Sequence, residues 1–233
     1  TQVEAYKEAE VRKTRFMAVV SHELRSPLHG IVGVAQQLVD EETVEQKAQL
    51  LGLVKGCASR LLDLVVSVME MATLAQKDAN GRIKTLTLHH DKVELPKLVQ
   101  ETITLVQNAE DKARRPLLRP GVSLVDRVSP MPMIFADKHR CTQVFFNIIA
   151  NACKFTQKGE IVVKSATDPD GRWVDVYVQD TGPGIPQDAL ERIFQPFEQE
   201  DTSDCRYFEG IGLGLSIAQE VVRLHGGRID VQS

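Results

Sequence analysis

An apolar repeat between residues 17 and 72 constrains the fold of this chain most strongly. In its second half, apolar side chains recur every three or four positions, which is the period of one face of an α-helix. This stripe consists of Leu51, Val54, Ala58, Leu61, Val65, Val68 and Ala72. Further apolar residues widen it on both sides: Leu50, Cys57, Leu64 and Met71 on one, and Leu62 and Met69 on the other. So broad a face is typical of a four-helix bundle rather than of a two-stranded coiled coil.

A second helix with a matching repeat precedes this one. Its apolar positions are spaced by seven residues at Met17, Leu24, Ile31 and Leu38. The segment Asp40–Thr43 separates the two helices, and Thr43 with Gln46 has the spacing of a helix capping box. Two helices cannot make a bundle of four, so the sequence predicts a homodimer of helical hairpins.

The first helix carries a histidine in an unusual setting. His22 is followed by Glu23 and then, within a turn, by Pro27. Proline inside a helix costs about 3 kcal/mol or more, because it removes a backbone hydrogen bond and crowds the carbonyl four residues back. Strain beside a titratable imidazole indicates a functional site. The heptad register puts His22 on the face opposite the apolar seam; His29, one heptad later, is interpreted as a surface residue.

The helical repeat stops near residues 77–92, and strand-like and helical segments alternate beyond it. Asp78–Gly81 reads as a helix stop followed by a turn. The predicted strands are 85–89, 122–128, 133–135, 161–166, 173–179 and 227–231. The predicted helices are 93–113, one capped by Asp137 and running to about Phe155, and 213–225. This order predicts an α/β sandwich with helices on one face of a mixed sheet. We expect a helical domain at 1–78, a linker with the first strand at 79–92, and a second domain at 93–233.

The composition excludes several classes of protein. Apolar residues make up 42% and charged residues 26% of the chain, as in globular proteins. The net charge of −4 provides no basic field that would attract nucleic acid or an anionic membrane. The four cysteines are far apart in the sequence, which favours free thiols in a reducing compartment. No apolar run reaches the roughly 18 residues that span a bilayer. We therefore expect a cytoplasmic segment without membrane contact, whose parent protein can still be membrane-anchored.

Polar residues share one face of the helix that Asp137 caps. Asn147, Asn151 and Lys154 are spaced by four and three residues, so they lie above one another on the helix. Amide oxygens suit Mg²⁺, which prefers oxygen ligands, and a lysine supplies a point charge for phosphates. The same spacing also fits an ordinary solvated helix face, so this pattern alone leaves both readings open.

A carboxylate followed by glycines ends the strand at 173–179. Val174, Val176 and Val178 occupy one face of that strand, and Asp180 continues their alternation toward the core. A carboxylate pointing inward needs a donor, because burying it unpaired is very costly. The exocyclic amine of adenine would serve as that donor, and Gly182 and Gly184 would allow close backbone approach. An ordinary strand-to-loop turn is the open alternative.

A glycine-rich segment opens the last predicted helix. Gly210, Gly212 and Gly214 would let backbone N–H groups approach a phosphate at the helix N-terminus. The segment is not a Walker A loop, because no Gly-Lys-Ser/Thr follows it. Before it, Phe194–Phe197 and the polar run 199–209 predict a mobile lid hinged on two aromatic residues.

Taken together, these segments resemble the catalytic core of sensor histidine kinases of the hybrid type. The resemblance covers nearly all of the chain. Segments around His22 and at Asn147–Thr156, Asp180–Ile185, Phe194–Phe197 and Gly210–Leu215 resemble the H, N, G1, F and G2 boxes in their family order. It implies a dimerisation and phosphoacceptor domain, followed by an ATP-binding domain of the Bergerat fold.

The resemblance also implies residue roles. His22 would accept the γ-phosphoryl group of ATP, while Glu23 would hydrogen-bond or deprotonate the imidazole. Asn151 would hold Mg²⁺, with Asn147 and Lys154 at the phosphates. The nucleotide site would be completed by Asp180, which reads adenine, and by Gly182, Gly184, Ile185, Phe194, Phe197, Arg206, Gly210, Gly212, Leu213, Gly214 and Leu215.

The implied partner is a response-regulator receiver domain, whose aspartate would take the phosphoryl group from His22. Hybrid kinases usually carry such a domain downstream in the same chain. Ser26, four residues past His22, occupies the position that in the family influences the reverse dephosphorylation.

Two positions depart from the family pattern. Ile211 stands where a threonine is usual, and Glu209 where a glycine is usual. A carboxylate near the triphosphate would weaken ATP binding, which leaves open a degenerate kinase that acts as a dimeric scaffold. A third alternative is an ATPase of the gyrase and Hsp90 superfamily. Those enzymes use a glutamate one turn before the magnesium asparagine, and here that position is Asn147, which cannot act as a base.

Overall fold

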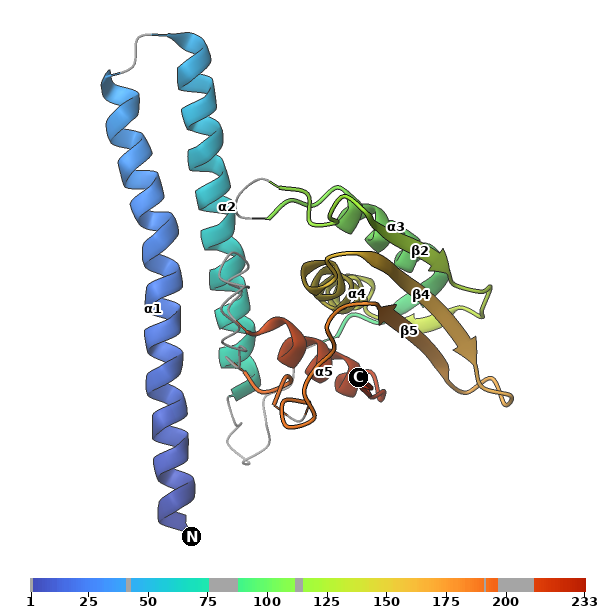
Figure 1. The fold of residues 1–233 in the computed structure, drawn as a ribbon. Helices are drawn as coiled ribbons and strands as arrows, with labels where there is room; N and C mark the ends of the chain where they lie inside the picture. Colours follow the sequence, from blue (N-terminus) through green and yellow to red (C-terminus); the bar gives the residue numbers. More distant parts are fainter. Residues whose placement is uncertain (1, 41–42, 76–87, 112–114, 191, 197–211) are drawn as a thin grey trace. The chain divides into compact units, whose positions relative to one another are not determined.

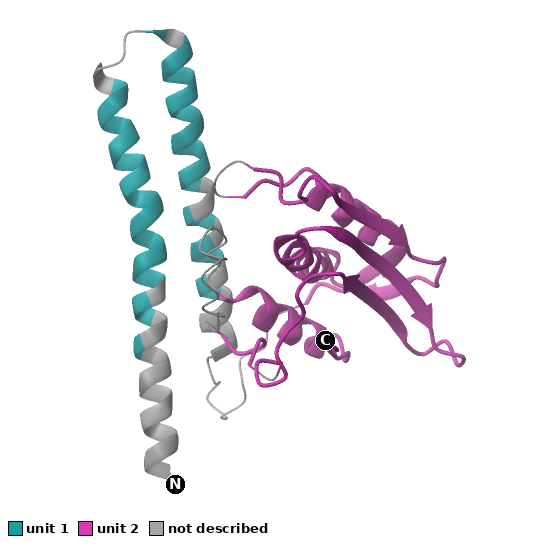
Figure 2. Cartoon of the chain, viewed as in Figure 1, with its two compact units in different colours: residues 1–84 teal, residues 85–233 magenta. Residues whose placement is uncertain are grey.

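The computed structural model describes residues 2–40, 43–75, 88–111, 115–190, 192–196 and 212–233 (Figure 1). The chain divides into two compact units, residues 1–84 and residues 85–233 (Figure 2). The first unit is a helical hairpin, and the second is an α/β domain.

The hairpin consists of α1 (Gln2–Asp40) and α2 (Val44–Ala75), which lie side by side (Figure 1). Of the two hydrogen bonds of the predicted capping box, the one from the Gln46 backbone N–H to Thr43 Oγ1 is observed, at 3.4 Å. The helices approach closely at Gly30, where an added Cβ would lie 2.9 Å from Cys57 Sγ. Pro27 lies inside α1, and the helix continues on both sides of it.

The hairpin buries only part of its apolar surface. Val20 and Leu64 are buried between the helices, with 9% and 6% of their surface exposed. Leu62 and Met69, seven residues apart on α2, remain 63% and 64% exposed. Other exposed large hydrophobic residues of this unit are Met17, Leu28, Val32, Leu51, Leu53, Val65 and Val66. One hairpin therefore leaves an apolar face uncovered, as the width of the sequence stripe predicts.

The α/β domain contains three longer strands in one mixed sheet. β2 (Val122–Arg127) runs parallel to β4 (Gly159–Thr167), and β4 runs antiparallel to β5 (Val174–Asp180), in the order β2-β4-β5. The predicted hairpin between β4 and β5 is confirmed, and its turn closes where Gly171 N–H donates to Asp168 O at 2.9 Å. The shorter strands β1 (Asp91–Val93) and β3 (Ile134–Ala136) form a separate antiparallel pair.

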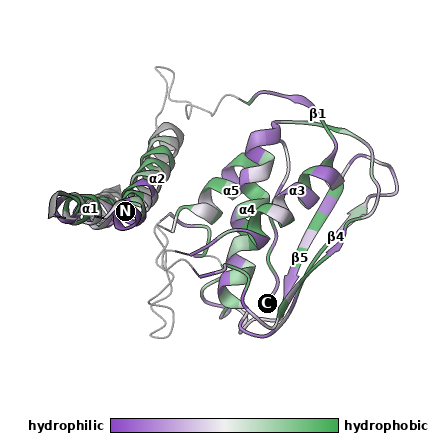
Figure 3. Cartoon of the chain, turned by 90° about the horizontal axis from the view of Figure 1, so that it is seen from above, coloured by the Kyte–Doolittle hydropathy of each residue, from purple (hydrophilic) through white to green (hydrophobic). Residues whose placement is uncertain are grey.

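In the described part of the domain, the helices are α3 (Leu95–Gln107), α4 (Lys138–Phe155) and α5 (Gly214–Leu224). α4 packs against both of the others. In Figure 3 hydrophobic and hydrophilic colours alternate along α4 and α5, as expected for helices that bury one face. Asp137 caps α4 as predicted, and Pro96 occupies the first turn of α3 as predicted.

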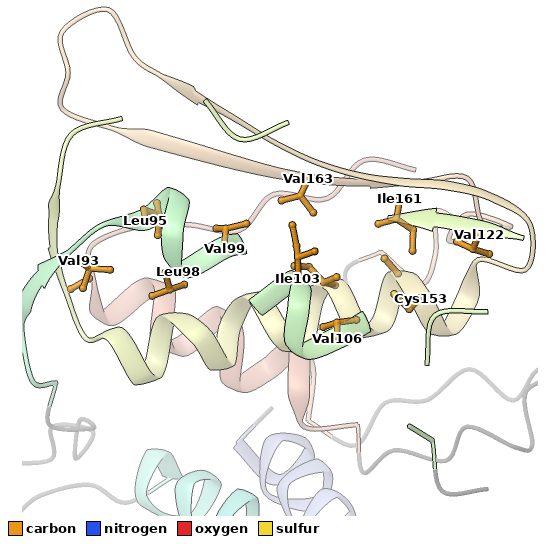
Figure 4. Close-up of a cluster of buried hydrophobic side chains, with 13 residues drawn as sticks. Val93, Leu95, Leu98, Val99, Ile103, Val106, Val122, Cys153, Ile161 and Val163 are labelled. Atoms are coloured by element: carbon orange, nitrogen blue, oxygen red, sulfur yellow. The ribbon is translucent and has the colours of Figure 1, made fainter. Parts of the chain in front are cut away.

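The core lies between this helical layer and one face of the sheet (Figure 4). From β4, Ile161 and Val163 point toward the helices, and both are fully buried. The helices contribute side chains at their own periodicity, among them Leu98, Val99, Ile103 and Val106 from α3 and Ile149 and Cys153 from α4. The predicted sandwich with helices on one face of a mixed sheet is thus confirmed.

Three predicted elements differ from the structure. Residues 85–87 of the first predicted strand lie outside the described residues, and the strand observed is β1, which begins only at Asp91. The helix predicted over 93–113 ends at Gln107. Asn108 N–H still donates to Thr104 O at 3.2 Å, but Ala109 N–H donates to Val106 O at 3.1 Å, three residues back, so the i to i−4 ladder stops there.

The strand predicted at 227–231 is absent from the structure. The chain there first completes the end of α5, where Gly227 N–H donates to Val222 O at 2.9 Å and Gly226 has φ +80°. Strand formation needs a paired edge, and residues 228–233 lie in no ladder.

The described cysteines Cys57, Cys141 and Cys153 are free thiols, as the sequence predicts. Burial raises the pKa of Cys141 and of Cys153 to about 11, with the Asp137 carboxylate adding to the effect at Cys141. Both thiols are therefore protonated near neutral pH and behave as small apolar side chains.

Candidate active site

His22 is the exposed histidine of α1 that the sequence singles out. Its side chain is 70% exposed, and its Nδ1 lies 3.5 Å from Glu23 Oε1. Glu23 is 13% exposed, so the carboxylate is held near the hairpin while the imidazole projects into solvent. The predicted outward position of His22 is confirmed. Ser26, one turn further on, is also exposed.

In the second unit, the polar face of α4 is where sequence patterning predicts it. Asn147, Asn151 and Lys154 are all half-buried, while Ile149 and Cys153 of the same helix are fully buried in the core. The Lys154 ammonium lies 4.9 Å from the centre of the Phe155 ring. The three polar side chains therefore lie at the rim of the core rather than inside it.

Asn147 joins this face to the start of α5. Its Nδ2 donates to Gly214 O at 3.2 Å, and an added Cβ on Gly214 would lie 3.4 Å from Asn147 Cγ. Leu213, which precedes the helix, is 2% exposed, and its carbonyl accepts from the Ser216 hydroxyl at 2.8 Å. Gly212 adopts φ +71°, a conformation that other residues rarely adopt. The N-terminus of α5 is thus seated directly on α4.

Asp180 ends strand β5 and opens the first glycine loop. The ladder pairs it with buried Ile161, so its alternation is as predicted, but the residue itself is exposed. The expectation that its carboxylate points into the core is therefore wrong, because β5 reaches the edge of the core at this residue. Asp180 Oδ1 accepts the Gly182 N–H at 2.8 Å, which leaves the second carboxylate oxygen for another donor.

Helix α4 also reaches this loop. An added Cβ on Gly182 would lie 2.7 Å from Asp180 Oδ1 and 3.5 Å from Phe155 O, so a side chain here would displace the carboxylate, which lies close to the end of α4. The helix rises by about 12 Å between Asn147, at the second glycine segment, and Phe155, at the first. Asn151 lies midway. One polar helix face therefore connects the two glycine segments.

The remaining predicted site residues make fewer described contacts or lie outside the described residues. Ile185 is half-buried, and its N–H donates to Ser233 Oγ at 2.6 Å. Gly184 has φ +77°, and Phe194 and Leu215 are half-buried. Phe197, Arg206, Gly210 and the departures Glu209 and Ile211 lie outside the described residues, as does most of the predicted lid.

Sequence reasoning recognised Asp137 as a helix cap but missed its other contacts. Its carboxylate accepts backbone N–H groups from Arg140 at 3.0 Å and from His89 at 2.9 Å, and its own N–H donates to His225 Nε2 at 3.0 Å. Burial raises the pKa of Asp137, but the two hydrogen bonds and the charge interactions with Arg140 and His89 together outweigh it, so the pKa lies below its usual value. A surface depression of about 400 Å³ lies here, at the N-terminus of α4 and apart from the polar face.

The donor set fits a hard cation held jointly with phosphates. Among the described residues, no group of three His, Cys, Asp or Glu side chains is arranged to hold a metal ion. Asn151 offers an amide oxygen at the rim of α4. Mg²⁺ characteristically takes one or two protein oxygens and completes its shell with waters and substrate phosphates. Asn151 therefore fits Mg²⁺ in the presence of a nucleotide, rather than a metal bound by the protein alone.

Comparison with known families identifies the class of protein. Residues 12–77 match the His Kinase A (phospho-acceptor) domain, and residues 136–233 match the Histidine kinase-, DNA gyrase B-, and HSP90-like ATPase family. The chain therefore belongs to the sensor histidine kinases and carries the two domains of their catalytic core. Each match lies within one of the two compact units, residues 1–84 and residues 85–233.

Individual relatives point to the same class. The chain is 34% identical over 233 residues to the hybrid signal transduction protein dokA of Dictyostelium discoideum, and 32% identical over 229 residues to the sensor histidine kinase GacS of Pseudomonas protegens. Each match covers 97% of this chain, but only 13% and 24% of the respective relative. The chain thus spans less than a quarter of the length of these two relatives.

A solved structure is similar in fold to most of the chain. The crystal structure of full-length ShkA in complex with AMPPNP is 32% identical, with a TM-score of 0.63, over 90% of this chain and 40% of that one. In the described part of the chain, no helix has both the length and the apolar composition needed to cross a membrane.

Proposed function

We propose that this chain is an ATP-dependent, autophosphorylating protein histidine kinase that phosphorylates His22 and then phosphorylates a response-regulator aspartate. The observation that carries the proposal is the exposed His22 with Glu23 at its Nδ1, in a chain that also has an ATPase-family domain. A packed structural histidine would not be 70% exposed on a helix face.

Glu23 prepares the imidazole for attack. A carboxylate next to Nδ1 favours the neutral tautomer that carries its proton there, which leaves the lone pair on Nε2. Nε2 attacks the γ-phosphorus of ATP, the bond from that phosphorus to the bridging oxygen breaks, and ADP leaves with the bond electrons. Glu23 stabilises or accepts the Nδ1 proton as positive charge develops on the ring.

Asp180 recognises the adenine. One carboxylate oxygen is engaged by Gly182 N–H, and the other accepts from the exocyclic amine of the base. Guanine presents a carbonyl at the same position, which the carboxylate repels. Gly182 and Gly184 let the backbone approach the ring, and Ile185 and Phe194 add apolar contact.

The phosphates lie between α4 and the start of α5. Lys154 contributes a positive charge, and Asn147 contributes its amide oxygen, because its Nδ2 is already engaged by Gly214 O. The N–H groups at the beginning of α5 favour an anion. Asn151 holds Mg²⁺, which neutralises charge on the phosphate oxygens when it is bound. The remaining contacts are assigned to Phe197, Arg206, Gly210, Gly212, Leu213, Gly214 and Leu215.

The chain acts as a homodimer and passes its phosphoryl group to a receiver domain. The uncovered apolar face of the α1–α2 hairpin supports dimerisation into a four-helix bundle. Relatives named as hybrid kinases support a receiver domain in the parent protein. Ser26 lies beside the phosphorylated face, where it influences dephosphorylation. We place the kinase core in the cytoplasm, whether or not the parent protein is membrane-anchored.

The direct test is incorporation of phosphate from γ-labelled ATP in the presence of Mg²⁺. The wild-type chain is expected to acquire label that is acid-labile and alkali-stable, as a phosphohistidine is. His22→Gln is expected to lose it. His29→Gln is the matched control, since His29 is also an exposed histidine of α1 and should leave labelling intact.

The same experiment separates the alternatives. An unlabelled wild type that still binds ATP would favour the degenerate scaffold, for which Glu209 and Ile211 are the sequence argument. ATP hydrolysis without protein labelling would favour the simple ATPase. Label that persists in His22→Gln would refute His22 as the acceptor.

A further inference from the structure

Thr181, the residue after Asp180, is held by Lys158 and Glu160, at the turn that leads into β4. Its Oγ1 accepts the Glu160 N–H at 3.1 Å and donates to Lys158 O at 3.1 Å. A hydroxyl has one proton and two lone pairs, so both hydrogen bonds form at once. The ladder between β4 and β5 ends at the pair Ile161–Asp180. The Thr181 hydroxyl thus extends the connection of these strands by one residue beyond their last backbone pair.

Gly159 is matched to this contact. It adopts φ +107°, and an added Cβ would overlap the Thr181 hydroxyl. Its N–H also donates to Gly121 O at 3.4 Å, which fastens the same turn to the start of β2. The turn can therefore surround the Thr181 side chain only because residue 159 has no side chain of its own.

The side chain of Asp180 is also held in place, by the loop that follows it. Its Oδ1 accepts from Gly182 N–H at 2.8 Å, and Gly182 lies against the end of α4 at Phe155 O. An exposed carboxylate at a strand end would otherwise sample several rotamers. Here the backbone before the loop is tied to β4 by Thr181, and the carboxylate is tied to the loop by Gly182.

We propose that Thr181 is a positioning residue for base recognition: its hydroxyl holds the end of β5 so that the Asp180 carboxylate meets the adenine amine. This inference rests on the proposed ATP site and adds a residue that does not itself touch the nucleotide. Loss of the hydroxyl frees the end of β5 and leaves the Glu160 N–H without its acceptor.

The test compares Thr181→Val with Thr181→Ser by calorimetry of Mg-ATP and Mg-GTP binding. Valine keeps the shape but loses both hydrogen bonds, and should weaken ATP binding about tenfold and reduce the preference for ATP over GTP. Serine keeps the hydroxyl and should bind nearly as the wild type does. Thr104→Val is the control, because that exposed hydroxyl donates within its own helix, to Gln100 O at 3.0 Å.

A second comparison uses glycines with positive φ. Gly159→Ala should weaken ATP binding, whereas Gly171→Ala, at φ +66° in open space, should not. If the variants fail to fold, hydrogen exchange of the wild-type chain still tests the proposal. Because linkage is reciprocal, ATP should slow hydrogen exchange of the Glu160 amide, and GTP should not.

The outcomes separate this inference from the proposed function. A wild-type chain that binds no ATP would overturn both. A wild type that binds ATP, together with a Thr181→Val variant of equal affinity and selectivity, would overturn only the role of Thr181. If ATP binding did not change the hydrogen-exchange rate of the Glu160 amide, the role of Thr181 would also be overturned.

Discussion

The burial of Asp180 differs from what its neighbours in the sequence predict. The alternation of β5 puts it on the same face as three valines, yet it is exposed where the strand leaves the core. This position suits a recognition residue, because a carboxylate at the rim is fixed by Gly182 and accessible to a ligand. Deep burial would have required a protein donor instead.

We expect Asp180→Asn to weaken ATP binding by about 1.5–3 kcal/mol, the contribution of a charge-assisted hydrogen bond. The asparagine can still accept from Gly182 N–H, so the loop should keep its shape. Isothermal titration calorimetry measures the affinity. Asp175→Asn, on the same strand and exposed, is the matched control and should bind ATP normally. Equal affinities for the two variants would argue against adenine recognition by Asp180.

At the scale of elements, α4 organises the candidate nucleotide site. Its first turn is capped by Asp137, its middle presents Asn147 and Asn151, and its end lies against Gly182. Contacts at three places along one helix come from segments far apart in the sequence. The capping carboxylate matters most for stability, since it also accepts from His89 and is 6% exposed.

Asp137→Ala is expected to lower the free energy of unfolding by about 1–2 kcal/mol, because α4 loses its cap and the His89 N–H loses its acceptor. Urea unfolding measures the change. Asp188→Ala is the control, since that carboxylate is 81% exposed and forms a surface ion pair with Arg192, and it should change stability by less than about 0.5 kcal/mol.

The same carboxylate predicts a pH dependence. Because the pKa of Asp137 is lower in the folded chain than its ordinary value of 3.8, its stabilisation is present above that value. It is lost as the pH falls further, through the folded-state pKa. Unfolding free energies measured between about pH 5 and pH 3 should therefore fall less steeply for Asp137→Asn than for the wild type. Parallel curves would contradict this assignment.

At the scale of the whole molecule, the helical hairpin lacks a cover for its apolar face. Leu62 and Met69 are more than 60% exposed, and they lie on the same side of α2 because seven residues make nearly two full turns. A second hairpin would bury these side chains, with roughly 2 kcal/mol available for each. The four-helix bundle is therefore the arrangement that this surface favours.

Sedimentation equilibrium at micromolar concentration should show a dimer for the wild type and a monomer for Leu62→Lys combined with Met69→Lys. The added charges repel each other across the seam and oppose burial. Gln49→Lys adds a charge on the opposite face of α2 and should leave the dimer intact. A wild type that is monomeric throughout this range would refute the proposed homodimer.

Features that lie within a single helix or turn could be predicted from the sequence. The helical period of residues 51–72, the cap at Asp137 and the turn at Asp168–Gly171 each involve neighbours along the chain, so sequence spacing was enough to find them. The polar face of α4 and the exposed His22 followed from the same helical period.

Features that join distant segments were decided by packing. The strand predicted at 227–231 is absent, because a short strand exists only where another edge pairs with it. The first strand that the structure describes begins at Asp91, where it pairs with β3. Thr181 meets Glu160 at the start of β4 across 21 residues, and Asn147 meets Gly214 across 67. The residue types of the candidate site can thus be recognised from local sequence patterns. Their positions relative to one another depend on which elements pack together. The spacing of residues along the chain does not specify that packing.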